Sequence, residues 1–182
     1  MPTVTIFGSN AVNVNDAGYQ EAYVLGQLLG QAGYTIATGG YAGTMEAASH
    51  GAKEAGAHVI GVTTGRFDGR GLTPNPWVDE EIKFQTLFQR LHYLVTCSDA
   101  LVALRGGVGT LSEVALTWSL LQVGEMPRKP FVLVGPQWLR IMEAYGRDST
   151  VRPRDLELLS FAENVHQVLP LLVRAGRPAG SA

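Results

Sequence analysis

The sequence predicts an α/β protein with a doubly wound, mostly parallel sheet that carries helices on both faces. Short runs rich in β-branched residues alternate with longer helical patterns, which indicates strand–helix–strand units. Residues 100–104 are apolar throughout, as in a strand that is buried on both faces. The 182 residues, 46% hydrophobic and 16% charged, are enough for one core. We therefore expect a single Rossmann-like domain over residues 1–175 and a disordered tail at 176–182.

The first half of the chain is predicted to place two helices between three strands. Asp16 is a candidate N-cap for the first helix, and Gly33 and Gly56 follow the two helices, where glycine commonly stops a helix. The expected order is a strand at 4–7, a helix from Asp16 to Gly33, a strand at 34–37, a glycine-rich turn at 39–43, an alanine-rich helix to about Ala55, a strand at 58–62 and a polar loop at 64–76.

The second half continues the alternation of strands and helices. Apolar residues recur at helical spacing in each predicted helix, and Pro127 closes the longest one. The expected order is a strand near 81–84, a helix at 86–96, the strand at 100–104, a helix beginning near Thr110, a strand at 131–134, a helix at 138–145, a strand at 156–161 and a terminal helix at 163–174 that Pro170 interrupts.

Composition and charge indicate a small-molecule partner. The net charge of -2 and the scattered arginines do not favour nucleic acid or a membrane surface. No apolar run is long enough to span a bilayer, and the N-terminus has no pattern of a signal peptide. The single cysteine, Cys97, excludes an internal disulfide. We expect a cytoplasmic protein.

Three glycines follow the buried strand at 100–104, at the start of the next helix. Gly106, Gly107 and Gly109 can expose successive backbone N–H groups, and the helix that begins near Thr110 adds its partial positive charge. The pattern predicts a phosphate site, with tight packing as the alternative role of the glycines. Neither G-x-x-x-x-G-K-[ST] nor G-x-G-x-x-G occurs, which argues against an ATPase or a standard dinucleotide enzyme.

Further residues are expected to line the same cleft, because parallel strands bring their carboxyl ends to one edge of the sheet. Gly8 and Ser9 follow the first strand, and Arg105 adjoins the phosphate turn. Gly39, Gly40 and Gly43 follow the second strand as a second glycine-rich turn.

Glu113 and Arg90 each allow two interpretations. Thr110-Leu111-Ser112-Glu113 fits the capping box S/T-x-x-E, yet the same position also holds a carboxylate near the sugar of a bound nucleotide. Arg90 is either an exposed surface arginine or a site residue on the helix at 86–96.

The chain resembles the LONELY GUY (LOG) family over residues 3–135. The motifs that carry the resemblance are, in order, the turn GGYAGTM at 39–45, Arg90, SDALV at 98–102 and GGVGTxxE at 106–113. The family consists of nucleoside 5′-monophosphate phosphoribohydrolases, often misnamed lysine decarboxylases. The resemblance implies that Gly106, Gly107, Gly109 and Thr110 bind the 5′-phosphate, and that Arg90 and Glu113 are the catalytic pair.

The sequence departs from the LOG pattern at three positions. Arg105 replaces the proline before the glycines, Leu91 replaces a lysine, and Glu46 replaces a glycine. Glu46 and the Leu111-Ser112 pair resemble a sister branch of the fold that includes molybdenum-cofactor carriers. Two functions are therefore expected: hydrolysis of the N-glycosidic bond of AMP or a cytokinin nucleotide, or non-catalytic binding of a phosphorylated ligand such as a nucleotide or molybdenum cofactor.

Other chemistries find no support in the residues. A pyridoxal enzyme needs a Schiff-base lysine, and Lys53, Lys83 and Lys129 lie in no recognisable cofactor motif, so we reject lysine decarboxylation. The histidines show no metal-ligand spacing, so we expect no metal and no cofactor. We expect a homodimer, because Trp118 and Trp138 are large apolar residues on outer helices and the resemblance implies relatives that are at least dimeric.

Overall fold

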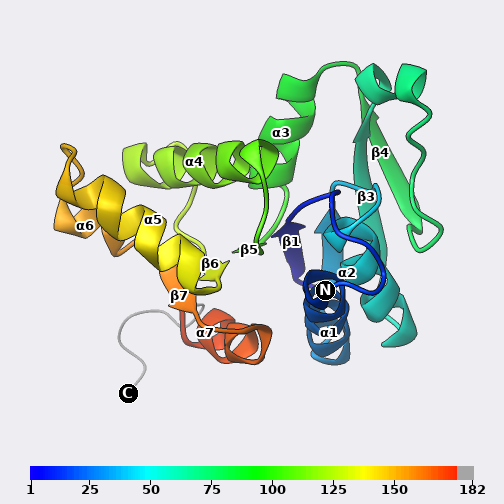
Figure 1. The fold of residues 1–182 in the computed structure, drawn as a ribbon, viewed down its shortest axis with the longest axis horizontal. Helices are drawn as coiled ribbons and strands as arrows, with labels where there is room; N and C mark the ends of the chain where they lie inside the picture. The colour runs from blue at the N-terminus through cyan, green and yellow to red at the C-terminus, as the bar shows by residue number, and fades with distance from the viewer. Residues whose placement is uncertain (176–182) are drawn as a thin grey trace.

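The computed structural model, which describes residues 1–175, contains a seven-stranded sheet in the order β4-β3-β2-β1-β5-β6-β7 (Figure 1). All six neighbouring strand pairs are parallel. The predicted α/β, Rossmann-like fold class is confirmed. The strands are β1 (Thr3–Phe7), β2 (Thr35–Thr38), β3 (Val59–Thr64), β4 (Glu80–Phe84), β5 (Ala100–Ala103), β6 (Phe131–Val134) and β7 (Ser160–Ala162).

Helices cover both faces of the sheet and enclose two apolar cores. The first core joins the sheet to α1 (Ala17–Gln31), α2 (Thr44–Glu54) and α7 (Val168–Ala175), and the second joins it to α3 (Leu87–Thr96), α4 (Val108–Val123) and α5 (Pro136–Arg147). Apolar residues of one strand alternate between the cores: Val102 faces the first, whereas Leu101 and Ala103 face the second. No helix in residues 1–175 is long and apolar enough to cross a membrane.

The strand order reverses at β1, which pairs with β2 on one side and β5 on the other. The chain leaves β1 toward α1 on one face and leaves β5 toward α4 on the opposite face. In open parallel sheets this divergence creates a crevice at the carboxyl ends of the strands, where ligands bind. The fold therefore places the segment after β1 and the glycine turn after β5 beside one another.

Several predicted boundaries are corrected by the structure. Part of the loop at 64–76 is a 3-10 helix, η1 (Gly65–Arg70), and α4 begins at Val108 rather than near Thr110. The last strand, predicted at 156–161, is the shorter β7 (Ser160–Ala162), and Leu156 instead ends the short helix α6 (Pro153–Leu156), where Pro153 suits the first position of a helix.

The end of the described chain also differs from the prediction. Asn164 caps a 3-10 turn, η2 (Val165–Gln167), and α7 follows it. Pro170 lies in the first turn of α7, where its missing N–H is tolerated, so it does not interrupt a longer helix. The predicted disordered tail at 176–182 lies outside the described residues.

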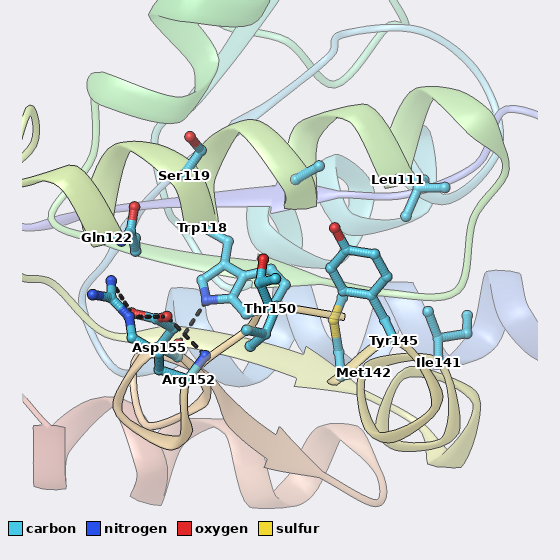
Figure 2. Close-up of a pocket in the computed structure, with 12 residues that line it drawn as sticks. Leu111, Trp118, Ser119, Gln122, Ile141, Met142, Tyr145, Thr150, Arg152 and Asp155 are labelled. Atoms are coloured by element: carbon cyan, nitrogen blue, oxygen red, sulfur yellow. Dashed lines mark hydrogen bonds and ion pairs between the residues drawn. The ribbon is translucent and has the colours of Figure 1, made fainter. Parts of the chain in front are cut away.

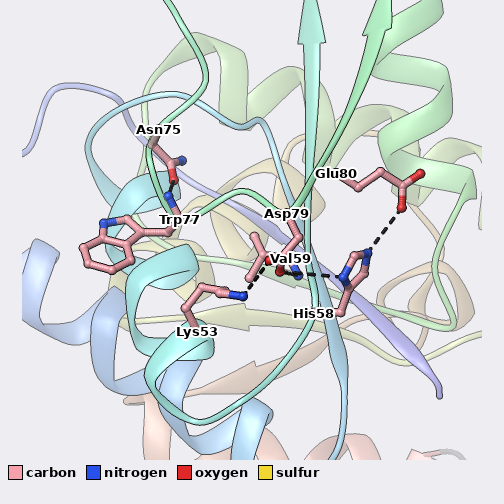
Figure 3. Close-up of polar contacts among 7 residues, drawn as sticks. All are labelled: Lys53, His58, Val59, Asn75, Trp77, Asp79 and Glu80. Atoms are coloured by element: carbon pink, nitrogen blue, oxygen red, sulfur yellow. Dashed lines mark hydrogen bonds and ion pairs between the residues drawn. The ribbon is translucent and has the colours of Figure 1, made fainter.

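The segment between β3 and β4 is fastened to the sheet near its far end. The Asn75 backbone N–H donates to the carbonyl of Gly40 at 2.8 Å, and its side-chain amide donates to the carbonyls of Gly40 and Tyr41. Figure 3 shows how Asp79 then accepts from the backbone N–H of Val59 and pairs with Lys53. Asn75 thus holds the segment against the turn that follows β2, and Asp79 ties its end to β3 and α2.

Candidate active site

The turn after β5 presents unpaired backbone N–H groups at the start of α4. Gly107 is the N-cap and has no side chain to cap the helix, and the first bond of the helix runs from the Leu111 N–H to the Gly107 carbonyl. The N–H groups of residues 107–110 therefore lack a helical acceptor. They carry the partial positive charge of the helix N-terminus, which favours an anion.

Gly107 and Gly109 are not explained by packing or backbone strain. A Cβ atom added at either position would meet no protein atom within 4 Å, and neither glycine has a positive φ. Gly106 is different, because its Cβ would lie 2.0 Å from Oγ1 of the buried Thr110. The surface at Gly107 and Gly109 is open, as close approach by a ligand requires.

A cavity of about 300 Å³ lies beside this turn. It brings together four of the residues predicted to bind phosphate or nucleotide: Ser9, Arg105, Gly106 and Gly107. Arg105 is exposed, and among the described residues it makes no hydrogen bond or ion pair. The remaining wall residues are Val12, Gly18, Glu21, Thr44 and Leu104.

The other predicted glycines are engaged by the protein itself. A Cβ at Gly39 would meet the Arg90 guanidinium at 2.2 Å, and one at Gly43, whose φ is +73°, would meet the Ser9 carbonyl at 2.3 Å. Gly40 also has a positive φ, and a Cβ at Gly8 would lie 2.1 Å from Oγ1 of Thr44. Direct ligand contact through these four glycines remains a prediction, and the structure gives each of them a packing role.

Arg90 is buried, so its interpretation as a surface arginine is wrong. Only 7% of the residue is exposed, and its Nε donates to the Val62 carbonyl at 2.7 Å and its Nη2 to the Gly39 carbonyl at 3.1 Å. In the described part of the chain Nη1 has no acceptor, and it is not among the fully buried polar atoms. The carbonyls of two strand-end segments thus hold one edge of the guanidinium, and Nη1 is left without a hydrogen bond to residues 1–175 and is not fully buried.

Glu113 does not form the capping box. The helix begins at Val108 and is capped by Gly107, so Thr110 already lies inside it and has no N-cap role. The Glu113 side chain is half-buried and accepts no hydrogen bond from residues 1–175. Burial raises the pKa of the Glu113 carboxyl to about 7, and the positive charge of Arg90 acts in the opposite direction. A carboxyl that titrates near neutral pH beside a buried cation is typical of a catalytic site.

A larger pocket lies elsewhere. It has a volume of about 780 Å³ and runs between α4 and α5, with Leu111, Trp118 and Tyr145 among its mostly apolar walls (Figure 2). At 100° per residue, these α4 positions lie on the side of the helix away from Glu113. The charged groups in this pocket, Arg152 and Asp155, are already paired with each other, so no unpaired charge converges there.

Sequence reasoning missed Tyr41, which lies against Arg90. Its ring is 5% exposed, and its centroid is 5.6 Å from the Arg90 Cζ. Tyr41 belongs to the glycine-rich turn at 39–43, whose spacing drew attention to its glycines and not to the aromatic residue between them. Within residues 1–175, no group of three His, Cys, Asp or Glu side chains is arranged to hold a metal ion.

The fold and site can now be compared with known proteins. A model of the SLOG cluster4 family matches residues 1–126. The chain belongs to this family. The match covers β1 through α4, and therefore includes Arg90, the glycine turn and Glu113. The resemblance to the LOG family stated from the sequence motifs is confirmed by this match and by the named relatives.

Several curated relatives of this SLOG cluster4 protein are named as LOG enzymes. A cytokinin riboside 5′-monophosphate phosphoribohydrolase of Mycobacterium tuberculosis is 30% identical over 154 residues, which are 80% of each chain. The phosphoribohydrolase LOG of Oryza sativa subsp. japonica is 36% identical over 115 residues, 61% of this chain and 47% of the rice protein. An uncharacterized protein of Archaeoglobus fulgidus is 35% identical over 98 residues, 54% of this chain and 62% of the archaeal one. The chain therefore spans about half of the rice relative and three-fifths of the archaeal one.

Solved structures of molybdenum cofactor proteins share the fold over nearly the whole chain. The molybdenum cofactor binding protein of Rippkaea orientalis is 27% identical with a TM-score of 0.75, covering 95% of this chain and 96% of its own. The molybdenum cofactor carrier protein of Chlamydomonas reinhardtii is 26% identical with a TM-score of 0.73, and the match covers 96% of this chain and 97% of the Chlamydomonas chain. Both a LOG-type enzyme and a carrier are thus among the proteins that this chain is similar to.

Proposed function

We propose that the protein hydrolyses the N-glycosidic bond of a nucleoside 5′-monophosphate of the AMP or cytokinin-nucleotide type. Water adds to the anomeric carbon of the ribose, the bond to the base breaks, and a proton passes to the base. The products are the free base and ribose 5-phosphate. The observation that carries this proposal is that the charge of Arg90, on α3, acts on the carboxyl of Glu113, which lies on α4 after the open glycine turn at the start of that helix.

The glycine turn binds the 5′-phosphate in this proposal. The N–H groups of residues 107–110 and the N-terminus of α4 attract the phosphate, and the missing side chains at Gly107 and Gly109 let it approach the backbone. Phosphate binding at a distance from the anomeric carbon holds the sugar in place for the reaction.

Glu113 stabilises the positive charge that develops on the ribose as the bond to the base breaks. This role needs the ionised carboxylate. Because the Glu113 pKa is raised to about 7, the ionised fraction grows as pH rises toward 7 and levels off above it. Arg90 presents its free Nη1 to the same cleft, where it orients the ligand and favours the charged form of Glu113.

The proposal is tested by measuring base release from AMP, other monophosphates and a cytokinin riboside monophosphate by chromatography. We expect Glu113→Gln to lower turnover by roughly 10²-fold or more, because glutamine keeps the size and loses the charge. Glu46→Gln is the control, since Glu46 lies in the first turn of α2, which follows β2 at this edge of the sheet, and the variant should keep its activity. Measurable binding of a monophosphate without release of any base would contradict hydrolysis.

A non-catalytic carrier is the second candidate function. It is supported by the similarity to the Rippkaea and Chlamydomonas molybdenum cofactor proteins and by Arg105, an exposed cation beside the glycine turn where the LOG pattern has proline. A carrier would bind the phosphorylated ligand and return it intact. Recovery of unchanged nucleotide or molybdenum cofactor after incubation favours this candidate over the enzyme.

We also propose a homodimer, which is supported by exposed apolar residues of α4 and α5 rather than by Trp118 and Trp138. Trp138 is only 3% exposed and donates its indole N–H to the Leu104 carbonyl, and Trp118 donates to the Asp155 carbonyl, so both are used within one chain. The exposed apolar residues of α4 and α5 are instead Val108, Leu111, Val123, Leu139, Ile141 and Tyr145. A monomeric mass by light scattering at micromolar concentration would contradict the dimer.

A further inference from the structure

Arg90 is a buried cation without a carboxylate bonded to it. Among residues 1–175 its hydrogen-bond acceptors are two backbone carbonyls, those of Val62 and Gly39, which engage Nε and Nη2. The two carbonyl oxygens hold the edge of the planar guanidinium that carries Nε and Nη2, but the group can still tilt about that edge. A further contact, away from that edge, is needed to hold the direction of Nη1.

The Tyr41 ring supplies a further contact to the guanidinium, away from these carbonyls. Its centroid is 5.6 Å from the Arg90 Cζ, within the range at which a cation is attracted to an aromatic ring. The ring is itself held firmly, because its hydroxyl accepts from the Thr64 N–H at 2.9 Å and donates to the Thr64 carbonyl at 3.3 Å. Asn75 fixes the backbone of the same turn through the carbonyls of Gly40 and Tyr41.

A second aromatic residue supports Tyr41 from the side of the β3–β4 segment. The Phe67 ring of η1 meets the Tyr41 ring edge-on, with centroids 5.6 Å apart and an angle of 61°. Arg70 lies over Phe67, its Cζ 5.4 Å from the ring centroid. The four side chains form a continuous column that leads from an exposed arginine of η1 to the buried guanidinium of Arg90.

We propose that Tyr41, braced by Phe67, is a positioning residue that holds the Arg90 guanidinium with Nη1 directed into the cleft. The expected effect on kcat rests on the proposed function. The expected effect on the position of Arg90 rests on the contacts alone. This arrangement also assigns a role to the polar segment after β3, because Phe67 of η1 supports the Tyr41 ring that contacts Arg90. Tyr41 and Phe67 do not contact the reacting atoms.

The experiment compares Tyr41→Leu, Tyr41→Phe and Phe67→Leu. Leucine removes the ring that faces Arg90, whereas phenylalanine keeps the ring and loses the two hydrogen bonds to Thr64, so it remains informative if Tyr41→Leu does not fold. Tyr23→Leu is the matched control, because Tyr23 also contacts a nitrogen-bearing ring, that of His50, but lies in the α1–α2 layer of the protein. The thermal melting temperature is measured for every variant.

The first measurement is the Nε–H signal of Arg90 in an NMR spectrum of the full chain labelled with 15N-arginine, assigned through Arg90→Lys. We expect Tyr41→Leu to shift this signal and to speed its exchange with water, with smaller changes in Tyr41→Phe and Phe67→Leu and none in Tyr23→Leu. An unchanged Arg90 signal in folded Tyr41→Leu, or in folded Tyr41→Phe together with Phe67→Leu, would overturn the proposal.

The second measurement separates this inference from the proposed function. If the wild type releases base, we expect Tyr41→Leu to lower kcat about 10-fold with little change in the KM for the monophosphate, since the glycine turn is intact. A wild type that releases no base, with the Arg90 signal shifted in Tyr41→Leu, rejects hydrolysis and supports the positioning role. Full kcat in folded Tyr41→Leu rejects the positioning role and leaves hydrolysis in place.

Discussion

The two glycine-rich turns of this protein have similar composition and opposite surroundings. The turn at 39–43 is largely buried: Asn75 binds its carbonyls, Arg90 lies against Gly39, and Gly43 packs on the Ser9 carbonyl. The turn at 106–109 is exposed, and Gly107 and Gly109 face open space. Glycine in the first turn makes room for other parts of the protein. In the second turn, Gly106 makes room for Thr110, whereas Gly107 and Gly109 border open space.

We interpret the first turn as structural support and the second turn as the proposed binding surface of a single site. The first turn carries Tyr41 and accepts the hydrogen bond from Arg90 at Gly39, so it builds the wall behind the guanidinium. The second turn starts α4, which carries Glu113. Glycine substitutions in the first turn should therefore act on folding, and substitutions of Gly107 or Gly109 in the second on ligand binding.

Gly43→Ala should have the largest effect. The residue has a φ of +73°, and the new Cβ would lie 2.3 Å from the Ser9 carbonyl oxygen, so strain and a clash with backbone add together. We expect a loss of about 3 kcal/mol or more in the free energy of unfolding, measured by urea denaturation. Gly56→Ala is the control: φ is +79° but no atom lies within 4 Å, so strain alone should cost about 1 kcal/mol. Equal losses in both variants would mean that the first turn is not tightly packed.

Glu113→Gln should change stability in a pH-dependent way, apart from its effect on turnover. The folded-state pKa of Glu113 is raised from 4.5 to about 7, so the folded protein holds this proton more tightly than the unfolded chain does. Stability from this group is present below pH 4.5 and is lost as pH rises through 7. At pH 8 the variant should be more stable than wild type by about 3 kcal/mol, and near pH 4 the two should match.

Chemical denaturation of both proteins at pH 4, 6 and 8 measures this difference. A variant that is less stable at every pH would show that Glu113 stabilises α4 and is not kept for catalysis. A gain at pH 8 together with lost turnover would identify Glu113 as a residue kept for function at a cost in stability.

The fold was largely predictable, because each strand and most helices depend on local patterns. The apolar run at 100–104 and the stop at Gly33 are properties of neighbouring residues. The start of α4 was not, since Thr110 looks like an N-cap and the helix begins at Val108 instead. Leu156, where the last strand was predicted to begin, ends a short helix instead, because Pro153 and the Arg152–Asp155 pair start one.

The site could be predicted only in part, for a physical reason. Arg90 and Glu113 were predicted through the motifs that resemble the LOG family, but the burial of Arg90 follows from contacts with the Gly39 and Val62 carbonyls, which are remote in sequence. Tyr41, Phe67 and Asn75 act through such long-range contacts alone. The two glycine turns could not be told apart, because composition does not show what occupies the space beside a glycine.

Gly109→Ala tests the open turn directly. A methyl group at this position meets no protein atom, and alanine favours a helix, so stability should be unchanged or rise by up to about 1 kcal/mol. The same methyl group obstructs approach to the N–H groups, and we expect the Kd for a nucleoside monophosphate to rise about 10-fold by calorimetry, with no change for the nucleoside. An unchanged Kd for the monophosphate would show that the ligand does not use this turn.

Arg105→Ala should have the smallest effect. It tests whether the proposed phosphate site extends from the open turn to the Arg105 side chain. Arg105 lines the same cavity as Gly106 and Gly107, is exposed, and makes no ion pair in the described chain, so its loss should change stability by less than about 0.5 kcal/mol. A charge-assisted contact with a bound phosphate should make the Kd of the monophosphate rise about 3-fold to 5-fold in the variant, while nucleoside affinity stays the same. Because the contact is exposed, the difference between wild type and variant should shrink at high salt, and Arg105→Lys should restore only part of it. Equal monophosphate affinities at low salt would place the side chain in solvent, and phosphate binding would then depend on the backbone of the turn alone.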